Sequence, residues 1–302
     1  MPSSVEIRPF RRSDREQLTA LVNLHVEAVV PGCAVSVNAL MSQLEREPGE
    51  AIVDPWVIER RTLVAVERDA IVAGAHLLRY ADDDRVSESY RDNGEIRWLV
   101  LRHDAAAAGD ALVAACFVVL DEWDAKRQWA DGSLPAPFVY GIPASWPHVR
   151  ALLRRSGFVH DGHVEILQVA RLDDLPSGGE PPLAGLELRR GVGGCGTRFS
   201  AELAGESVGM IEVQSDLTGG GSLVRFAGWA DIGNLNVREE LRRRGIATWL
   251  LAEAADWLRL GGVTRLVSYA WPEETDGLAF YAANGFRELV RTERGWSRQR
   301  RP

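Results

Sequence analysis

The chain has 302 residues, 46% of them hydrophobic and 26% charged, a composition typical of a globular protein with room for two compact domains. It excludes a disordered or fibrous chain. The net charge of −8 argues against a nucleic-acid partner, because such partners usually bind a basic surface. No run approaches the roughly 18–20 apolar residues of a membrane span, and residues 1–16 lack the apolar segment of a signal peptide, so the sequence predicts a cytoplasmic protein with no membrane partner.

The cysteines and histidines do not form a recognisable site. Cys33, Cys116 and Cys195 are odd in number and far apart, which predicts neither a disulfide nor a cysteine zinc site. All six histidines lie within the first 163 residues, and His160 and His163 flank an Asp-Gly pair without a third ligand at motif spacing. We therefore expect no metal, and no histidine-based catalysis by the second half alone.

In the first half, strand-like and helix-like segments alternate. We expect strands at 5–9, 63–66, 71–78, 95–101, 138–140 and 158–170, and helices at 13–29, 36–46, 109–123 and 147–156. Ser13 and Glu16 have the spacing of a capping box, and Arg68-Asp69 marks the turn of a hairpin. Helices inserted into a largely antiparallel sheet give an α+β order.

A stretch rich in Pro, Gly, Ser and acids separates this half from the next. We expect an N-terminal domain at 1–172, a linker at 173–185 and a C-terminal domain at 186–302. The second half repeats the order, with strands at 186–190, 198–213 (a hairpin), 231–237, 265–271 and 286–292, and helices at 246–260 and 273–283. Only residues 191–197 separate its first strand from its hairpin, so this copy has no room for the first two helices.

The run Arg242-Arg243-Arg244-Gly245-Ile246-Ala247 lies between an expected strand and an amphipathic helix. The first N–H groups of a helix have no intrahelical partner, and the helix dipole adds positive potential there. Gly245 allows close approach of a ligand, and arginines add charge-assisted hydrogen bonds. The run therefore predicts an anion site.

Two ordered motifs resemble those of the GNAT N-acetyltransferase superfamily. Arg242, Gly245 and Ala247 match its acetyl-CoA signature, although the family often has Pro where Glu239 stands, and Tyr281 stands four residues before a Gly-Phe pair as in its second signature. The resemblance implies acetyl-CoA as co-substrate without a metal. It also implies cofactor contacts from Leu235, Asn236, Val237, Arg242, Arg243, Arg244, Gly245, Ile246, Ala247 and Thr248.

The same resemblance implies that Tyr281 protonates the departing thiolate, a role that suits a phenol with an ordinary pKa of about 10. The family often carries Asn, a polar contact to the cofactor, where Glu274 stands, so this contact is altered here. A general base is expected among strand carboxylates. The candidates are Asp231, which shares strand parity with Val237, and Glu212 on the preceding strand, each of which could equally be an exposed strand acid.

The first half also resembles the superfamily, in EIRPFRRSDREQL at its start and in ALLRRSGF near its end. Aligning Leu101 with Val237 places Ala106 where Arg242 stands and Asp110 where Ile246 stands, and Leu153 takes the place of Tyr281. An acid beside a pyrophosphate would repel it. The N-terminal copy is therefore interpreted as degenerate.

Together these features predict two tandem GNAT-like domains, each a mixed, mostly antiparallel sheet flanked by helices. The leading interpretation is direct transfer of acetyl from acetyl-CoA to a primary amine of a small molecule. A cationic acceptor would suit the residues before 186, whose net charge is −9. A protein acceptor stays open as an alternative. The tandem order also resembles the mycothiol synthase branch of the superfamily, which stays open too. The protein could be a monomer or a homodimer. The alternative is a non-catalytic acyl-CoA-binding regulatory or scaffold protein.

Overall fold

The computed structural model describes residues 5–45, 56–136, 140–215, 217 and 226–299. The chain forms two compact units. Unit 1 comprises Met1–Val164 together with Arg291–Pro302, and unit 2 comprises Glu165–Val290. Among the described residues, no helix is long and apolar enough to cross a membrane.

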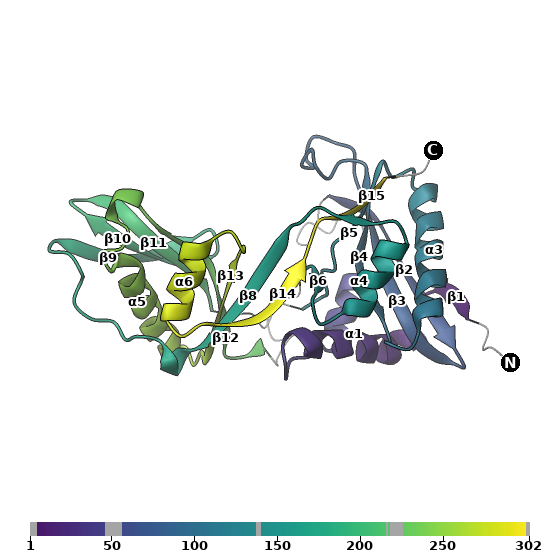
Figure 1. Ribbon diagram of the computed structural model, residues 1–302, viewed down its shortest axis with the longest axis horizontal. Helices are drawn as coiled ribbons and strands as arrows, with labels where there is room; N and C mark the ends of the chain where they lie inside the picture. The colour runs from purple at the N-terminus through teal and green to yellow at the C-terminus, as the bar shows by residue number, and fades with distance from the viewer. Residues whose placement is uncertain (1–4, 46–55, 137–139, 216, 218–225, 300–302) are drawn as a thin grey trace. The chain divides into compact units, whose positions relative to one another are not determined.

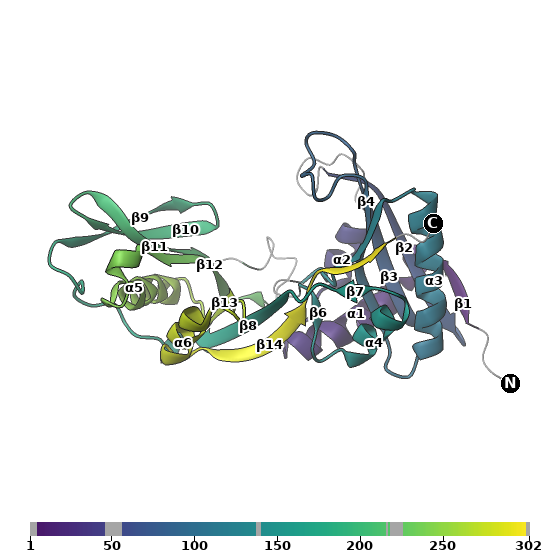
Figure 2. The same ribbon diagram turned by 45° about the horizontal axis from the view of Figure 1, so that its top comes forward.

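Unit 1 is a sheet with helices on both faces (Figures 1 and 2). Its strands follow the order β1-β2-β3-β4-β5-β15-β7. The strands of this sheet are β1 (Glu6–Pro9), β2 (Val57–Glu67), β3 (Ala70–Tyr80), β4 (Asn93–Leu101), β5 (Arg127–Ala130), β7 (Val159–His160) and β15 (Trp296–Gln299). The short strand β6 (Ile142–Pro143) belongs to the second sheet. The helices are α1 (Arg15–Val29), α2 (Val37–Leu44), α3 (Ala106–Glu122) and α4 (Pro147–Arg155).

Two glycines show how closely the helices approach this sheet. A Cβ at Gly74 of β3 would lie 2.7 Å from Leu18 of α1, and one at Gly94 of β4 would lie 2.5 Å from Leu120 of α3. Because α1 and α3 lie on opposite faces, these contacts place the core of unit 1 in two layers around β3 and β4.

Local sequence signals account for several element ends. Ser36 caps α2 by accepting a hydrogen bond from the Ala39 amide at 3.1 Å. Arg68 and Asp69, with φ of 49° and 64°, form the tight turn between β2 and β3. The expected capping box at Ser13 is wrong, because a 3-10 turn precedes α1 and the Asp14 carboxylate accepts from the Arg11 amide instead.

For the first half, one expected strand is not tested by the structure and one observed strand was not expected. The expected strand at 138–140 falls largely outside the described residues. Strand β5 was not expected from the sequence, because it has only four residues and a short alternating pattern. Its pairing with β4 is parallel, so the partner strand is reached only through α3.

Unit 2 contributes most of the second sheet, with the order β6-β14-β8-β13-β12-β11-β10-β9. Its elements are β8 (Val164–Arg171), β9 (Leu186–Gly193), β10 (Gly196–Leu203), β11 (Glu206–Gln214), β12 (Trp229–Val237), α5 (Ile246–Leu260), β13 (Arg265–Ala270), α6 (Thr275–Ala283) and β14 (Arg287–Glu293). The β9–β10 connection contains no helix, as its length predicts. Helix α5 packs on one face of β10, β11 and β12, and in the described part of unit 2 no helix covers their other face (Figure 2).

The units divide the chain at other positions than those expected from the sequence (1–172, 173–185 and 186–302). Strand β8 from the first half pairs antiparallel along the whole of β13, whereas β15 from the second half pairs with β5 and β7 of unit 1. The two halves thus exchange their last strands.

The expected linker is part of unit 2 and packs on α5. The Trp249 indole donates to the Gly179 carbonyl at 3.1 Å, and the Gly178 amide donates to Asp256 at 2.8 Å. A coil that satisfies its polar groups on a helix has the same Pro and Gly content as a free linker, so composition alone did not distinguish the two.

Candidate functional site

A groove of about 840 Å³ opens in unit 2 where two parallel strands separate. Strands β12 and β13 pair only from Trp229 to Asp231, opposite Arg265 to Val267, although β12 continues to Val237. Beyond Asp231, the edge of β12 that would pair with β13 faces the groove. The other walls come from the loop before α5 and from α6. A parted strand pair of this kind offers free backbone N–H and C=O groups to an extended ligand.

A β-bulge at Gly233 sets which side chains of β12 face which way. Glu212 pairs with Asn234 and Val213 with Ile232, so Gly233 is the extra residue. Ile232 and Val237 consequently belong to the same buried core, although their sequence parity differs. The expected shared parity of Asp231 and Val237 is therefore wrong, because the bulge turns Asp231 to the face away from α5.

The bulge also requires a glycine. A Cβ at Gly233 would lie 2.5 Å from the Cβ of Cys195, in the turn between β9 and β10. This turn therefore packs directly on the bulge, at the wall of the groove. Any larger residue at position 233 would displace it.

The loop before α5 has the backbone geometry of an anion site. Gly245 is the N-cap of α5 with a φ of 84°, a left-handed conformation that favours glycine, and Arg243 also has a positive φ of 59°. The amides of Ile246, Ala247 and Thr248 form the first turn of this helix, where N–H groups have no intrahelical acceptor. Such a helix start attracts anions.

The three arginines of the run have different surroundings. Arg242 donates from Nε to the Val237 carbonyl at 3.1 Å, which fixes the loop to the end of β12. Arg243 pairs with Asp276 of α6 at 2.9 Å across the rim of the groove, with both side chains exposed. Arg244 does not line the groove.

The structure brings together all the other expected cofactor residues in the groove wall. These are Leu235, Asn236, Val237, Arg242, Arg243, Gly245, Ile246, Ala247 and Thr248. Asn234, Tyr269 and Asp276 line the same groove but were not expected as site residues from the sequence. The signature gave no signal for Asn234 and Tyr269, which enter the wall through the bulge and the separation of the strands, and Asp276 comes from α6.

Tyr281 of α6 also lines the groove and is 8% exposed. Its ring packs edge-on against Phe286 with centroids 5.0 Å apart. Burial raises the pKa of Tyr281 to about 12, with an opposing effect from Ser268 and a small further increase from the Glu274 carboxylate. The hydroxyl therefore stays protonated at neutral pH.

Asp231 occupies the last paired position of β12, at the point where the strands part. Burial raises the pKa of Asp231 to about 6, although backbone amides of Gln214 and Asp231 itself oppose the shift. Its Oδ1 atom is buried and has no hydrogen-bond partner among the described residues. A carboxylate with this pKa is ionised at neutral pH and more basic than an ordinary aspartate.

Glu212, the other candidate base, has its carboxylate engaged. Its Oε1 accepts from Arg198 Nε at 2.6 Å and from the Gly194 amide at 3.1 Å. Burial acts to raise the pKa of Glu212, but the hydrogen bonds from Arg198 and from the amides of Gly194 and Cys195 outweigh it and lower the pKa. The side chain thus holds the short β9–β10 connection in place, and neither it nor Asp231 is part of the groove wall.

Unit 1 contains the same strand arrangement without the loop. Strands β4 and β5 pair in parallel from Asn93 to Ile96, and Arg97 is the bulge residue. Glu95 lies opposite Trp129, as Asp231 lies opposite Val267. At the start of α3, however, Ala106 stands in the place of Arg242, and Asp110, in the place of Ile246, pairs with Arg155 at 2.5 Å.

Comparisons with known proteins agree with this geometry. The Acetyltransferase (GNAT) family profile matches residues 168–286. A search of curated proteins found none that matches.

Solved structures resemble the whole chain. A tandem GNAT protein from the clavulanic acid biosynthesis pathway is 16% identical with a TM-score of 0.65, and the match covers 99% of each chain. A GCN5-related N-acetyltransferase from Sphaerobacter thermophilus is also 16% identical with a TM-score of 0.65, over 100% of this chain and 98% of that one.

A third similar structure is much longer. It is the GCN5-related glucosamine N-acetyltransferase region of a fungal multi-domain GH3 beta-N-acetylglucosaminidase, 16% identical with a TM-score of 0.61. The match covers 98% of this chain and 38% of that protein. At these identities the likeness shows the fold. The GNAT family profile thus matches most of unit 2, and the solved structures show that the whole chain has the fold of tandem GNAT proteins.

Proposed function

We propose that unit 2 is an N-acetyltransferase that moves the acetyl group of acetyl-CoA directly to a primary amine of a small molecule. The observation that carries this proposal is the continuous groove from the parted edge of β12 to the amides at the start of α5. Its wall includes both the parted strand edge and the helix start, so these groups would act on one extended ligand with an anionic end. The family's use of acetyl-CoA supplies the identity of that ligand.

Each group has a defined part in the proposed binding. The amides of Ile246, Ala247 and Thr248 would hold the pyrophosphate, with Arg242 adding positive charge beside them. The exposed edge at Leu235 to Val237 would hold the pantetheine arm by backbone hydrogen bonds. This arrangement would direct the thioester toward the point where β12 and β13 part.

Asp231 and Tyr281 would then perform the proton transfers. The amine nitrogen attacks the thioester carbonyl carbon, a C–N bond forms and the C–S bond breaks. Asp231 accepts the proton that the amine loses, directly or through a water, and Tyr281 donates a proton to the leaving thiolate. Their pKa values of about 6 and about 12 suit a base and an acid at neutral pH. Transfer is direct, without a covalent enzyme intermediate.

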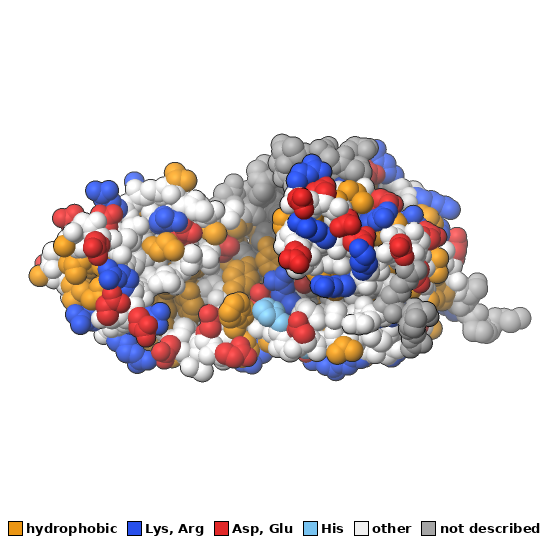
Figure 3. Space-filling model, turned by 90° about the horizontal axis from the view of Figure 1, so that it is seen from above, with side chains coloured by type: hydrophobic (Ala, Val, Ile, Leu, Met, Phe, Trp, Pro, Cys, Tyr) orange, Lys and Arg blue, Asp and Glu red, His pale blue; other side chains and the backbone are white. Residues whose placement is uncertain are grey.

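The acceptor is proposed to be small and cationic, because the chain carries a net charge of −8. On the face of the molecule seen in Figure 3, arginines are interspersed with acids, and no single basic patch gathers there. This face thus offers no footprint for a nucleic-acid backbone.

Isothermal titration of the full chain with acetyl-CoA tests the proposal at its first step, and release of free CoA thiol with a panel of primary amines tests the second. We expect saturable binding, weakened by Arg242→Met, and amine-dependent thiol release. Absence of acetyl-CoA binding, with or without amines present, would refute the proposal. Tight binding with no thiol release from any amine would instead favour a non-catalytic acyl-CoA-binding protein.

A further inference from the structure

Two buried polar side chains lie opposite each other in the apolar core of unit 2, and neither lines the groove. Ser268 of β13 is fully buried and Gln168 of β8 is 6% exposed, and the two are directly paired in antiparallel register. The next pair on that face, Leu266 with Ala170, belongs to the core that also contains Tyr281. Because residues two apart in a strand share a face, Ser268 and Gln168 face the same core.

The oxygen atoms of this pair oppose folding where they lie. The Ser268 hydroxyl and the Gln168 side-chain oxygen are buried, and neither has a hydrogen-bond partner of ordinary geometry among the described residues. A polar group buried without a hydrogen bond is destabilising, so apolar side chains of similar size would be more stable at both positions. A stability cost at two adjacent positions calls for a functional explanation.

Tyr281 connects this pair with the groove, because it belongs to the same core and also lines the groove wall. Burial raises the pKa of Tyr281, and the nearby Ser268 hydroxyl opposes that rise. A neighbouring hydroxyl lowers the pKa of a phenol by donating a hydrogen bond to the ionised form, the phenolate. Ser268 therefore favours the form of Tyr281 that exists after its proton has left.

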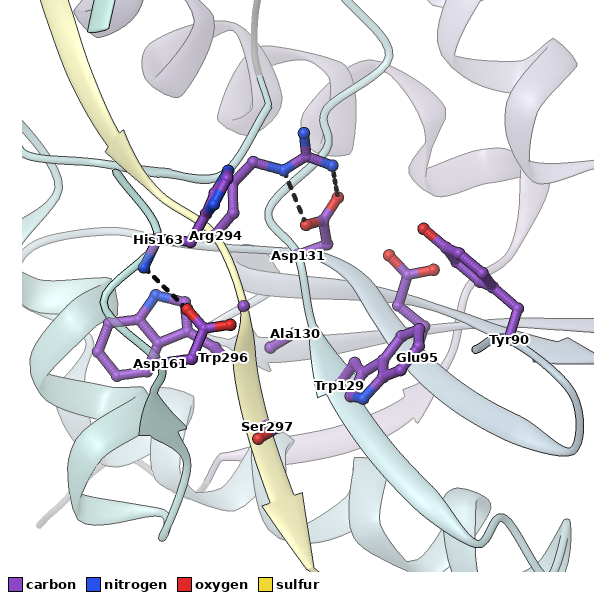
Figure 4. Close-up of a pocket in the computed structure, with 11 residues that line it drawn as sticks. Tyr90, Glu95, Trp129, Ala130, Asp131, Asp161, His163, Arg294, Trp296 and Ser297 are labelled. Carbon is purple, nitrogen blue, oxygen red and sulfur yellow. Dashed lines mark hydrogen bonds and ion pairs between the residues drawn. The ribbon is translucent and has the colours of Figure 1, made fainter. Parts of the chain in front are cut away.

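The equivalent positions of unit 1 hold apolar side chains. Ala130 of β5 takes the place of Ser268, because the parallel pair β4–β5 is equivalent to the pair β12–β13. Ala130 lies opposite Trp296 of β15, which is therefore in the place of Gln168 (Figure 4). Neither replacement offers a side-chain oxygen.

Unit 1 also lacks the phenol. Leu153 stands where unit 2 has Tyr281, and it is fully buried. The unit with the phenol thus has the polar pair, and the unit without the phenol has an apolar one. Since both units share the fold, the fold itself does not require the hydroxyl of Ser268. This difference is the one expected if Ser268 acts through Tyr281.

We propose that Ser268 is a positioning residue for Tyr281 in the acetyl transfer proposed for unit 2. Directly opposite residues of an antiparallel pair have Cβ atoms about 4.5–5.5 Å apart, so the Gln168 oxygen is within reach of the Ser268 hydroxyl. As Tyr281 gives its proton to the sulfur of the departing CoA, the Ser268 O–H turns from Gln168 to the phenolate oxygen. Ser268 keeps its own proton, and the phenolate regains one from water after the products leave. The inference rests on the proposed function, in which Tyr281 is the acid.

A double-mutant cycle tests this role, with turnover measured by release of CoA thiol at saturating acetyl-CoA and amine. Ser268→Ala should lower kcat by about tenfold and change the KM for acetyl-CoA by less than about twofold. In a Tyr281→Phe background the same substitution should have no further effect, because no phenolate forms there. Ser207→Ala, at an exposed position of β11, is the control and should leave turnover unchanged in both backgrounds.

Two outcomes of the cycle would overturn the inference. One is an unchanged kcat in Ser268→Ala, and the other is an equal loss in both backgrounds, which would mean a merely structural role. Urea unfolding accompanies the cycle. Because the Ser268 hydroxyl is unpaired, Ser268→Ala should be at least as stable as wild type, so lost turnover would not reflect a failure to fold.

A second measurement detects the hydrogen bond without any activity. 3-Fluorotyrosine placed at position 281 ionises at lower pH than tyrosine, and its fluorine NMR shift follows the ionisation. Ser268→Ala should raise the pKa of this phenol by about one unit, a tenfold change in acidity, and an unchanged pKa would overturn the inference. A wild type that releases no CoA thiol with any amine would instead be the failure of the proposed function. The fluorine titration would then still decide whether Ser268 acts on the phenol at position 281.

Discussion

Asp231→Asn separates the catalytic value of this residue from its effect on stability. The folded pKa of about 6 lies above the ordinary 3.8, because burial disfavours the ionised carboxylate. Because the pKa is raised on folding, the contribution of the protonated Asp231 carboxyl to stability is fully present below pH 3.8 and is lost as the pH rises through about 6. The difference of about two pKa units corresponds to about 3 kcal/mol at most.

Asparagine cannot ionise, so the variant should keep that stability at pH 8. Urea unfolding followed by circular dichroism should show wild type losing up to about 3 kcal/mol, relative to the variant, between pH 4 and pH 8. Asp173→Asn is the matched control, since that side chain is 79% exposed. It should not change the pH dependence.

The Asp231→Asn substitution should lower activity, although it raises stability at pH 8. For wild type, kcat/KM should rise with pH through about 6 and then level off, because the ionised carboxylate is the proposed base. In Asp231→Asn this inflection should disappear and the plateau should fall by roughly 10²–10⁴-fold. A variant that keeps both the wild-type plateau and the inflection, measured by release of CoA thiol, would refute the assignment of Asp231 as the base.

Three further changes test the groove. Tyr281→Phe keeps the packing against Phe286 but removes the hydroxyl that would donate the proton. Turnover should fall by about tenfold or more, while acetyl-CoA affinity measured by titration changes little. Unchanged turnover at saturation would exclude the role of Tyr281 as the acid. Gly245→Ala forces a side chain into a φ of 84° with its Cβ 3.2 Å from Pro182, which should cost about 1 kcal/mol in urea unfolding and weaken acetyl-CoA binding. Arg242→Met removes a positive charge and the hydrogen bond to the Val237 carbonyl. It should weaken acetyl-CoA binding by about tenfold, with a smaller effect at high salt. An affinity equal to that of wild type would show that the amides of α5 suffice.

Features that depend on near neighbours in the chain were readable from the sequence. The α5 bounds agree with the expected 246–260, because Gly245 and Gly261 end the apolar periodicity on both sides. The same local pattern predicted a turn at Gly245 and a helix that presents Tyr281 close to a Gly-Phe pair. The missing helices of unit 2 followed from chain length alone.

The tertiary structure decided which side chains meet. The bulge at Gly233 reverses the parity of β12, so the face of Asp231 follows from the pairing with β11 and was not readable from alternation along the strand. The role of Glu212 depends on Arg198 and on a turn that the chain brings over it. The exchange of β8 and β15 depends likewise on hydrogen bonds between strands far apart in sequence. Backbone donors and acceptors are the same for every residue, so a strand carries no label for its partner, and only the packed molecule selects one.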